Sequence, residues 1–324
     1  MFIKNIIVNT IMKPSILVGG QAVIEGVMMR VPGAYATAVR DAKGEIHIDK
    51  HNFTSKVENS KLWKKPVLRG IISLFESLKM GMQTLQWSGD IAMSEEEKKK
   101  EPGKLAQFFT TSTAILIALG LFMAAPYWLT TRLFLVEKEA FLFNIVAGFF
   151  RILFFILYLL LISLMKDVKR LFQYHGAEHR VVYNFESGKA LTVKNAQSFP
   201  TQHPRCGTSF LFIVMISAII IFSVIDTVFI GFFGGLTVLS RIGLHLLMMP
   251  LVAGISYEVL KMSARNSRNI FFRILKAPGL WLQNITTKEP EDAMVEVAIE
   301  SLKNAFGDKY NDVIGKKYIA EAIG

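Results

Sequence analysis

FLFNIVAGFFRILFFILYLLLISLM, residues 141–165, is the stretch that decides the fold class of this chain. One ionisable side chain, Arg151, interrupts it, and the run FFILYLLLISL within it carries no charge. A helix needs about 20 predominantly apolar residues to cross the hydrocarbon core of a bilayer. The stretch therefore predicts a transmembrane helix rather than a buried helix of a soluble domain.

Three further segments have the same length and character, at residues 105–131, 209–233 and 236–262. The chain of 324 residues is 52% hydrophobic and only 19% charged, and its apolar residues are concentrated in these blocks. This composition is more apolar than that of ordinary soluble domains. The sequence predicts a helical membrane protein with about four transmembrane helices.

The basic residues indicate the orientation of these helices. Lys and Arg crowd three flanks: Lys98, Lys99, Lys100 and Lys104; Lys166, Lys169, Arg170 and Arg180; Lys261, Arg265, Arg268, Arg273 and Lys276. The two opposite loops hold Arg132, Lys138 and, near the loop, Arg241. By the positive-inside rule, we expect a multi-pass inner-membrane protein with both termini cytoplasmic. The formal charge of +11 thus suits an anionic lipid bilayer as partner, and nucleic acid is not expected.

Six parts are expected along the chain. They are a cytoplasmic β-rich N-terminal domain (1–60), an amphipathic helix and charged connector (61–104), a first transmembrane hairpin (105–165), a cytoplasmic motif loop (166–208), a second transmembrane hairpin (209–262) and a cytoplasmic helical tail (263–324). No signal peptide is expected in the opening residues, because lysines and asparagines interrupt their apolar positions.

Local patterns predict elements outside the spans. YATAVRDAKGEIHIDK indicates two strands around a turn at 41–44, and GGQAVIEGVMMRVPG before it indicates bends where the backbone approaches another group. An amphipathic helix is expected over residues 62–93, lying on the membrane or on the β unit through one apolar face. That face comprises Leu68, Ile71, Ile72, Phe75, Leu78 and Met82. Pro278-Gly279 predicts a break after the last span.

The stretch KRLFQYHGAEHRVVYNFESG contains the residues best suited to chemistry. His175 and His179 are four apart, so on a helix both imidazoles project from one face and can share an ion. Together with Glu178 they spell H-x-x-E-H, in which two histidines bind zinc and the glutamate is a general base. Gly176 within the motif disfavours a helix by about 1 kcal/mol relative to alanine.

A catalytic zinc needs a third protein ligand and an open position for water. His203 and Cys206, in the segment TQHPRCGTS, are the candidates, since both motifs are expected at the same membrane face. A second interpretation makes Cys206 a reactive thiolate with His203 or His179 as its partner, and a third is a closed structural metal site. Glu258, at the inner end of the fourth span, is a further candidate ligand or supporting residue.

The ionisable residues Arg151, Asp226 and His245 stand out inside the predicted spans. Such groups are costly in a bilayer and usually face the protein interior in pairs. Arg151 can pair with Asp226 if its side chain extends outward. An interhelical clamp is favoured over a proton or ion pathway, because four spans leave little room for a transport route.

The sequence resembles the YqhQ-like family of bacterial integral membrane proteins, which have a domain of unknown function and are predicted metal-dependent enzymes. The resemblance rests on GGQAVIEGVMMR (19–30), YHGAEHRVVYNFESG (174–188), NAQSFPTQHPRCGTSFL (195–211) and MPLVAGISYEVLK (249–261). It implies a membrane protein with a metal site. Because the metal assignment depends on the same histidines, it adds little to the argument from the residues.

The favoured function is metal binding, with metal-dependent hydrolysis at the cytoplasmic membrane face as the expected activity. In this hypothesis His175, His179, His203 and Cys206 supply ligands to a divalent transition metal, zinc first, and Glu178 is catalytic. The alternative is a non-enzymatic regulator or assembly factor of another membrane protein complex. A transporter would require Arg151, Asp226 and His245 to line one water-filled cavity.

Overall fold

The computed structural model describes residues 16–94, 103–136, 138–266 and 269–318. The opening residues and most of the expected charged connector therefore lie outside the described part of the chain.

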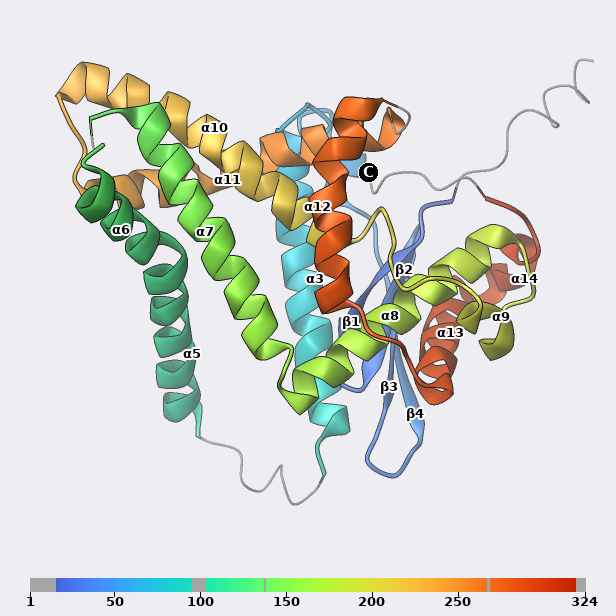
Figure 1. The fold of residues 1–324 in the computed structure, drawn as a ribbon. Coiled ribbons are helices and arrows are strands. Elements are labelled where there is room, and N and C mark those ends of the chain that lie inside the picture. Colours follow the sequence, from blue (N-terminus) through green and yellow to red (C-terminus); the bar gives the residue numbers. More distant parts are fainter. Residues whose placement is uncertain (1–15, 95–102, 137, 267–268, 319–324) are drawn as a thin grey trace, which may run out of the picture.

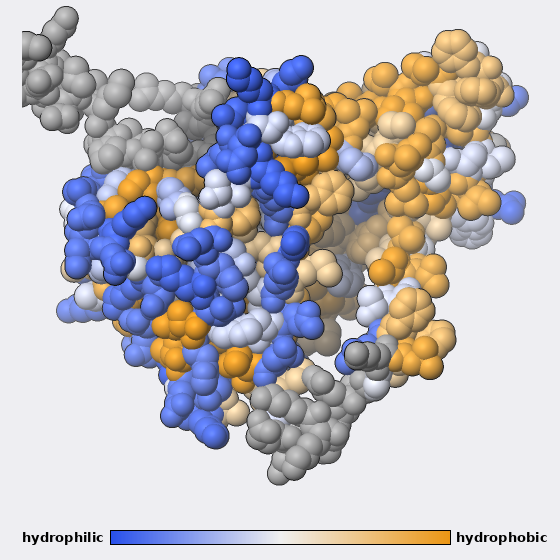
Figure 2. All heavy atoms as spheres, turned by 180° about the vertical axis from the view of Figure 1, so that it is seen from behind, coloured by the Kyte–Doolittle hydropathy of each residue, from blue (hydrophilic) through white to orange (hydrophobic). Residues whose placement is uncertain are grey.

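Four helices are long and apolar enough to cross a membrane, and they coincide within a few residues with the predicted spans. The first is built from α5 (Lys104–Leu119), a π-helical turn η1 (Gly120–Ala124) and α6 (Ala125–Phe134). The others are α7 (Ala140–Ile162), α10 (Gly207–Phe233) and α11 (Val238–Arg265). Their apolar side chains are largely exposed at the surface, where they form the extended hydrophobic region of Figure 2. Such a surface suggests association with a membrane.

A second unit contains a four-stranded antiparallel sheet in the order β1-β2-β3-β4. Its strands are β1 (Gly19–Val23), β2 (Gly26–Val31), β3 (Ala34–Arg40) and β4 (Ile46–Asn52). The strands β3 and β4 form the expected hairpin, with Gly44 in the left-handed region at φ +90°. Figure 1 shows this sheet beside α3 (Leu68–Ala92) and α8 (Lys166–Ser187), away from the first apolar helix.

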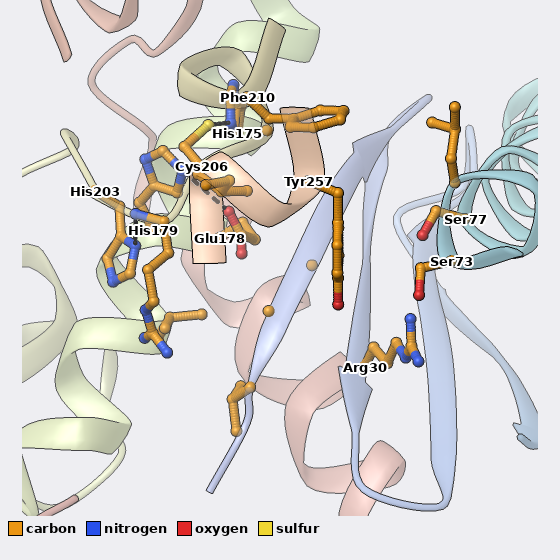
Figure 3. A pocket seen from close by; sticks show the side chains of 18 of the residues that line it. Arg30, Ser73, Ser77, His175, Glu178, His179, His203, Cys206, Phe210 and Tyr257 are labelled. Carbon is orange, nitrogen blue, oxygen red and sulfur yellow. Dashed lines mark hydrogen bonds and ion pairs between the residues drawn. The ribbon is translucent and has the colours of Figure 1, made fainter. Parts of the chain in front are cut away.

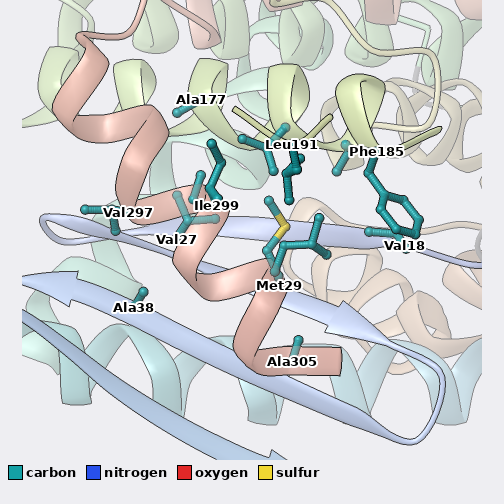
Figure 4. Close-up of a cluster of buried hydrophobic side chains, with 14 of the residues drawn as sticks. Val18, Val27, Met29, Ala38, Ala177, Phe185, Leu191, Val297, Ile299 and Ala305 are labelled. Carbon is teal, nitrogen blue, oxygen red and sulfur yellow. The ribbon is translucent and has the colours of Figure 1, made fainter. Parts of the chain in front are cut away.

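Two helices from distant parts of the chain cover one face of the sheet. They are α8 (Lys166–Ser187), which follows the second apolar helix, and α13 (Asp292–Phe306), near the C-terminal end. Alternate residues of β2, such as Val27 and Met29, pack against Ala177 of α8 and Val297 of α13 in one hydrophobic core (Figure 4). Three short elements complete this unit, α9 (Val193–Gln197), η2 (Gly307–Lys309) and α14 (Tyr310–Val313).

The bends expected in GGQAVIEGVMMRVPG are present as turns at residues 24–25 and 32–33, and the residues between them form the strands β1 and β2. The expected close approach of the backbone is present. A Cβ on Gly26 would lie 2.2 Å from the Ala38 carbonyl oxygen, and one on Gly20 would lie 2.8 Å from Cγ of Glu178. Gly20 and Gly26 therefore serve strand pairing and contact with α8, whereas Gly33, at φ +88°, lies in the turn after β2.

The expected amphipathic helix is α3 (Leu68–Ala92), preceded by the short α2 (Lys56–Asn59). Of the two placements expected for its apolar face, the β unit does not cover Phe75, Leu78 and Met82, which are more than half exposed. Small residues make the contacts instead, with Gly81 against Gln21 of β1 and Gly70 against α11. Helices approach closely where side chains are small, which the hydrophobic pattern does not reveal.

The break expected at Pro278-Gly279 is also wrong. Helix α12 (Ile270–Thr286) continues through Pro278 and packs against α10. A Cβ on Gly279 would lie 2.6 Å from Cα of Ser209, so the glycine permits this close helix contact. Tertiary packing overrides the local preference for a helix end at proline.

Candidate metal centre

Helix α8 presents the motif histidines from one face. The helix is continuous through Gly176, despite the low helix propensity of glycine. A Cβ at this position would lie 2.1 Å from the carbonyl oxygen of Lys288. Gly176 thus allows the chain that follows α12 to run directly over the motif, and the i,i+4 arrangement of His175 and His179 is preserved.

His175, His179 and Cys206 form what we call the His–Cys cluster: their ligand atoms all lie within 4.8 Å of one another. The distance from His175 Nε2 to Cys206 Sγ is 3.1 Å. The other ring nitrogen of each histidine faces a backbone carbonyl, that of Thr286 for His175 at 2.8 Å and that of Thr201 for His179. Because a carbonyl only accepts, both Nδ1 atoms carry the proton. Both Nε2 lone pairs are therefore available at the centre of the cluster (Figure 3).

His203 lies beside the cluster rather than in it. Its ring centroid is 5.5 Å from that of His179, and the side chain is buried. Gln283 of α12 fixes its backbone by accepting from the His203 N–H at 2.7 Å and donating to the His203 carbonyl at 2.9 Å. Among the described residues the Nε2 atom of His203 has no hydrogen-bond partner. The Arg205 N–H donates to Nδ1 at 3.4 Å, so in the neutral ring Nε2 carries the proton, and the Glu186 carboxylate lies 3.9 Å from it. His203 is therefore a candidate fourth ligand only if its ring changes tautomer.

Glu178 is buried next to the cluster, with a carboxylate oxygen 3.4 Å from His179 Nε2. The Gly20 N–H of the edge strand β1 donates a hydrogen bond to this carboxylate. Glu178 thus lies between the candidate ligands and the sheet. From there its carboxylate could accept a proton from a molecule bound at the cluster.

Burial sets the protonation of the site. It lowers the pKa of His175 and of His179, and it lowers the pKa of His203 to about 4. The same desolvation raises the pKa of Glu178. Histidines that remain neutral near pH 7 keep the lone pair that metal coordination requires.

Cys206 occupies the N-cap of α10 and is buried. The partner expected for a reactive thiolate was His203 or His179. The structure instead brings His175 to Sγ at 3.1 Å, with His179 also in hydrogen-bonding reach. The guanidinium of the neighbouring Arg205 is bound by the carboxylate of Glu186. The Glu186 carboxylate therefore neutralises much of the positive charge that was expected to stabilise a Cys206 thiolate.

Glu258 does not join the site. Its carboxylate binds Arg69 of α3, with Arg69 Nε 2.7 Å away, and accepts from the Val67 N–H at 3.3 Å. The expectation that Glu258 serves as a ligand or supporting residue is wrong. The reason is that Arg69 of α3, a helix far from Glu258 in the sequence, neutralises its carboxylate. This ion pair links α3 to α11.

The ionisable residues of the apolar helices form a network that differs from the expected pair. Asp226 binds Arg241 at 3.0 Å and His245 at 2.8 Å, and Asn144 donates to it at 2.7 Å. The Arg151 guanidinium donates to the Tyr127 hydroxyl and to the Phe122 carbonyl in the π-helical turn. Arg241, placed near a loop by the sequence, is almost fully buried. The predicted pair of Arg151 with Asp226 is therefore wrong. Buried polar side chains instead link α6, α7, α10 and α11.

A cavity of about 280 Å³ opens beside the cluster. The three cluster residues line it together with His203 and Glu178. Tyr257 of α11 and Phe210 of α10 form another part of its wall. The site thus lies where the apolar helices meet the sheet unit, with room for a ligand next to the candidate ligands.

Several residues that shape this site had no signal in the sequence. Thr286 and Thr201 act through their carbonyls, which any residue possesses, and Gln283 is one amide among many in the chain. Arg30 and Gly20 stand in a glycine-rich stretch for which the sequence predicted only close backbone contacts.

Four helices long and apolar enough to cross a membrane are joined to a sheet-and-helix unit, and a His–His–Cys cluster at the junction could hold a metal ion. Residues 65–308 match the family described as "Protein of unknown function (DUF1385)". The chain is 33% identical over 297 residues to "Uncharacterized protein YqhQ" of Bacillus subtilis (strain 168), covering 87% of this chain and 90% of that protein. No solved structure matches. The chain belongs to the YqhQ-like, DUF1385 family.

Proposed function

We propose that this protein is a metal-binding membrane protein whose centre is the His–Cys cluster. One observation carries the proposal: two imidazole Nε2 atoms and a thiol sulfur converge within 4.8 Å, and backbone carbonyls hold both imidazoles in the ligating tautomer. Ligating histidines characteristically donate their second N–H in this way.

The donor set fits a divalent transition metal, zinc first. Imidazole and thiolate are preferred zinc ligands, and catalytic zinc sites use three protein ligands with a fourth position open. His203 is the proposed fourth ligand of a closed site, which requires its proton to move from Nε2 to Nδ1. The adjacent cavity favours the open alternative, in which a bound zinc would supply a Lewis acid and lower the pKa of a water molecule to about 7.

The proposed activity is hydrolysis, with Glu178 as the catalytic residue. Its carboxylate lines the cavity beside His179, and burial raises its pKa. A general base is most effective when its pKa lies close to the pH at which the enzyme works. The Gly20 N–H orients the Glu178 carboxylate. A non-enzymatic regulator or assembly factor bound to another membrane complex is the competing function, and the role of Glu178 separates the two.

We also propose that the site lies on the cytoplasmic side of the bacterial inner membrane, with both termini on that side. The excess of Lys and Arg at the inner flanks of the four apolar helices supports this orientation. A substrate embedded in or close to the membrane, lipid or peptide, would reach the cavity from there.

The test compares Glu178→Gln with His175→Ala and His179→Ala in purified protein and in cells that depend on the gene. We expect both histidine variants to lose a stoichiometric transition metal. Glu178→Gln should keep the metal and lose cellular function. If Glu178→Gln keeps both metal and function, the hydrolytic role is excluded and the regulator remains. If the wild type holds no metal, the centre itself is excluded.

A further inference from the structure

A second cavity, of about 480 Å³, adjoins the one beside the His–Cys cluster. The two cavities share Gly19, Gly20, Arg30, Ser73 and Ser77 in their walls. The space therefore extends from the candidate metal centre along the edge strand β1 to the face of the sheet covered by α3.

Arg30 stands where the two cavities meet. In β2, alternate residues point to opposite faces, so Arg30 lies on the same face as Met28, which packs with Met80 of α3. Its guanidinium stacks on the Phe53 ring at 4.5 Å, and Ser73 and Ser77 of α3 present their hydroxyls nearby (Figure 3). Ser73 is also within hydrogen-bonding reach of the Tyr257 hydroxyl.

The positive charge of Arg30 lacks a direct counter-ion. No carboxylate of the described residues forms an ion pair with it, and the acidic groups that act on it at longer range are Glu76 and Glu58. Glu76 is engaged by the Ser55 hydroxyl and the Lys56 N–H, both at 2.7 Å. Burial lowers the pKa of Arg30, so an anion in the cavity would stabilise its charged form.

Arg30 and Glu178 line the same cavity, and the two β1 residues beside them, Gly19 and Gly20, carry no side chains. Gly19 is the residue paired with Arg30 across the β1–β2 ladder, and Gly20 follows it with its N–H on Glu178. A ligand could therefore place one group at Arg30 and another beside the cluster. The remaining wall is apolar, with Leu74 of α3, Phe210 of α10 and Leu260 of α11.

We propose that Arg30, Ser73 and Ser77 form an anion subsite that binds the phosphate of an amphiphilic substrate, with its hydrocarbon part along Leu74, Phe210 and Leu260. An arginine fork with hydroxyl donors suits phosphate oxygens, and the apolar wall belongs partly to helices that can cross the membrane. This inference rests on the proposed function, because it assigns a substrate class to the same site.

The test is calorimetric titration of the full-length protein in non-ionic detergent. The probes are short-chain phosphatidic acid, the matching uncharged diacylglycerol and inorganic phosphate. We expect saturable binding of phosphatidic acid, at least tenfold weaker in Arg30→Gln and unchanged in Arg273→Gln, which alters an exposed arginine on α12. Diacylglycerol and inorganic phosphate should each bind at least tenfold more weakly than phosphatidic acid.

The variants separate the possible failures. Wild-type affinity in Arg30→Gln would overturn the subsite. If Arg30→Gln does not fold, the same titration is made with the double variant Ser73→Ala and Ser77→Ala. Wild-type affinity of that variant for phosphatidic acid would likewise overturn the subsite. Equal affinity for inorganic phosphate would overturn the amphiphile and assign the subsite to soluble phosphates. Arg30-dependent binding that persists in metal-free His175→Ala supports the subsite, whereas absence of metal from the wild type contradicts only the proposed function.

Discussion

At the residue scale, Gly176 allows two segments of the centre to pack closely because it has no side chain. The carbonyl of Lys288 occupies the place where its Cβ would be, and the neighbouring Thr286 carbonyl binds His175. In Gly176→Ala the gain in helix propensity, about 1 kcal/mol, opposes an overpacking cost of about 1–3 kcal/mol. Because the clash is with backbone, we expect a lower unfolding temperature and reduced metal content, measured by fluorimetry and elemental analysis.

Gly231→Ala is the matched control for this prediction. Gly231 also lies inside a helix, α10, but a Cβ there meets no atom within 4 Å. Its unfolding temperature should stay equal or rise slightly, and its metal content should not change. A Gly176→Ala protein that matches this control in both measurements would show that the chain after α12 does not hold the motif.

At the scale of the elements, the Asp226 network joins α7, α10 and α11 through buried polar contacts. Removing one member of a buried ion pair leaves the other uncompensated, at a cost of about 3–5 kcal/mol. Asp226→Asn should therefore lower the unfolding temperature strongly, as should Arg241→Gln. The double variant should lose less than the sum of the two single losses, because it removes both charges.

Arg132→Gln controls for the loss of an arginine, since Arg132 is exposed at the end of α6. It should leave the unfolding temperature within about one degree of the wild type, because exposed charges contribute little to stability. Strictly additive losses in the Asp226 and Arg241 variants would argue against direct coupling between these two residues.

The elements also show where sequence reasoning succeeds and where it fails. The four apolar helices were predictable, because a segment of this length and hydropathy can form few structures other than a long apolar helix. Helix α12 was not, because its passage through Pro278 depends on the contact of Gly279 with Ser209. For α3 the sequence left two placements of the apolar face open, the membrane and the β unit, because a pattern shows that a face is apolar but not what it contacts.

The candidate site was predictable to a similar degree. The sequence placed His175, His179 and Cys206 near one another because one motif leaves a span and the other enters the next. It did not predict that His203 would stand aside with its backbone held by Gln283, nor that Glu258 would bind Arg69. These arrangements depend on contacts between segments far apart in the chain, which have no local pattern.

At the scale of the whole molecule, the orientation in the membrane determines which compartment the centre faces. In a Cys206→Ser background, Lys138→Cys and Lys189→Cys place single thiols at exposed positions, the first between α6 and α7 and the second just after α8. A membrane-impermeant maleimide should label the first in intact cells and the second only after lysis. The reverse result would place the cluster outside the cytoplasm and contradict the proposed topology.

X-ray absorption spectroscopy of the zinc-loaded, full-length protein tests the central claim most directly. We predict nitrogen ligands at about 2.0–2.1 Å and one sulfur at about 2.3 Å. The sulfur contribution should disappear in Cys206→Ser, and zinc should be lost in His175→Ala. A zinc environment of oxygen and nitrogen alone, unchanged in Cys206→Ser, would contradict a metal centre built on the His–Cys cluster.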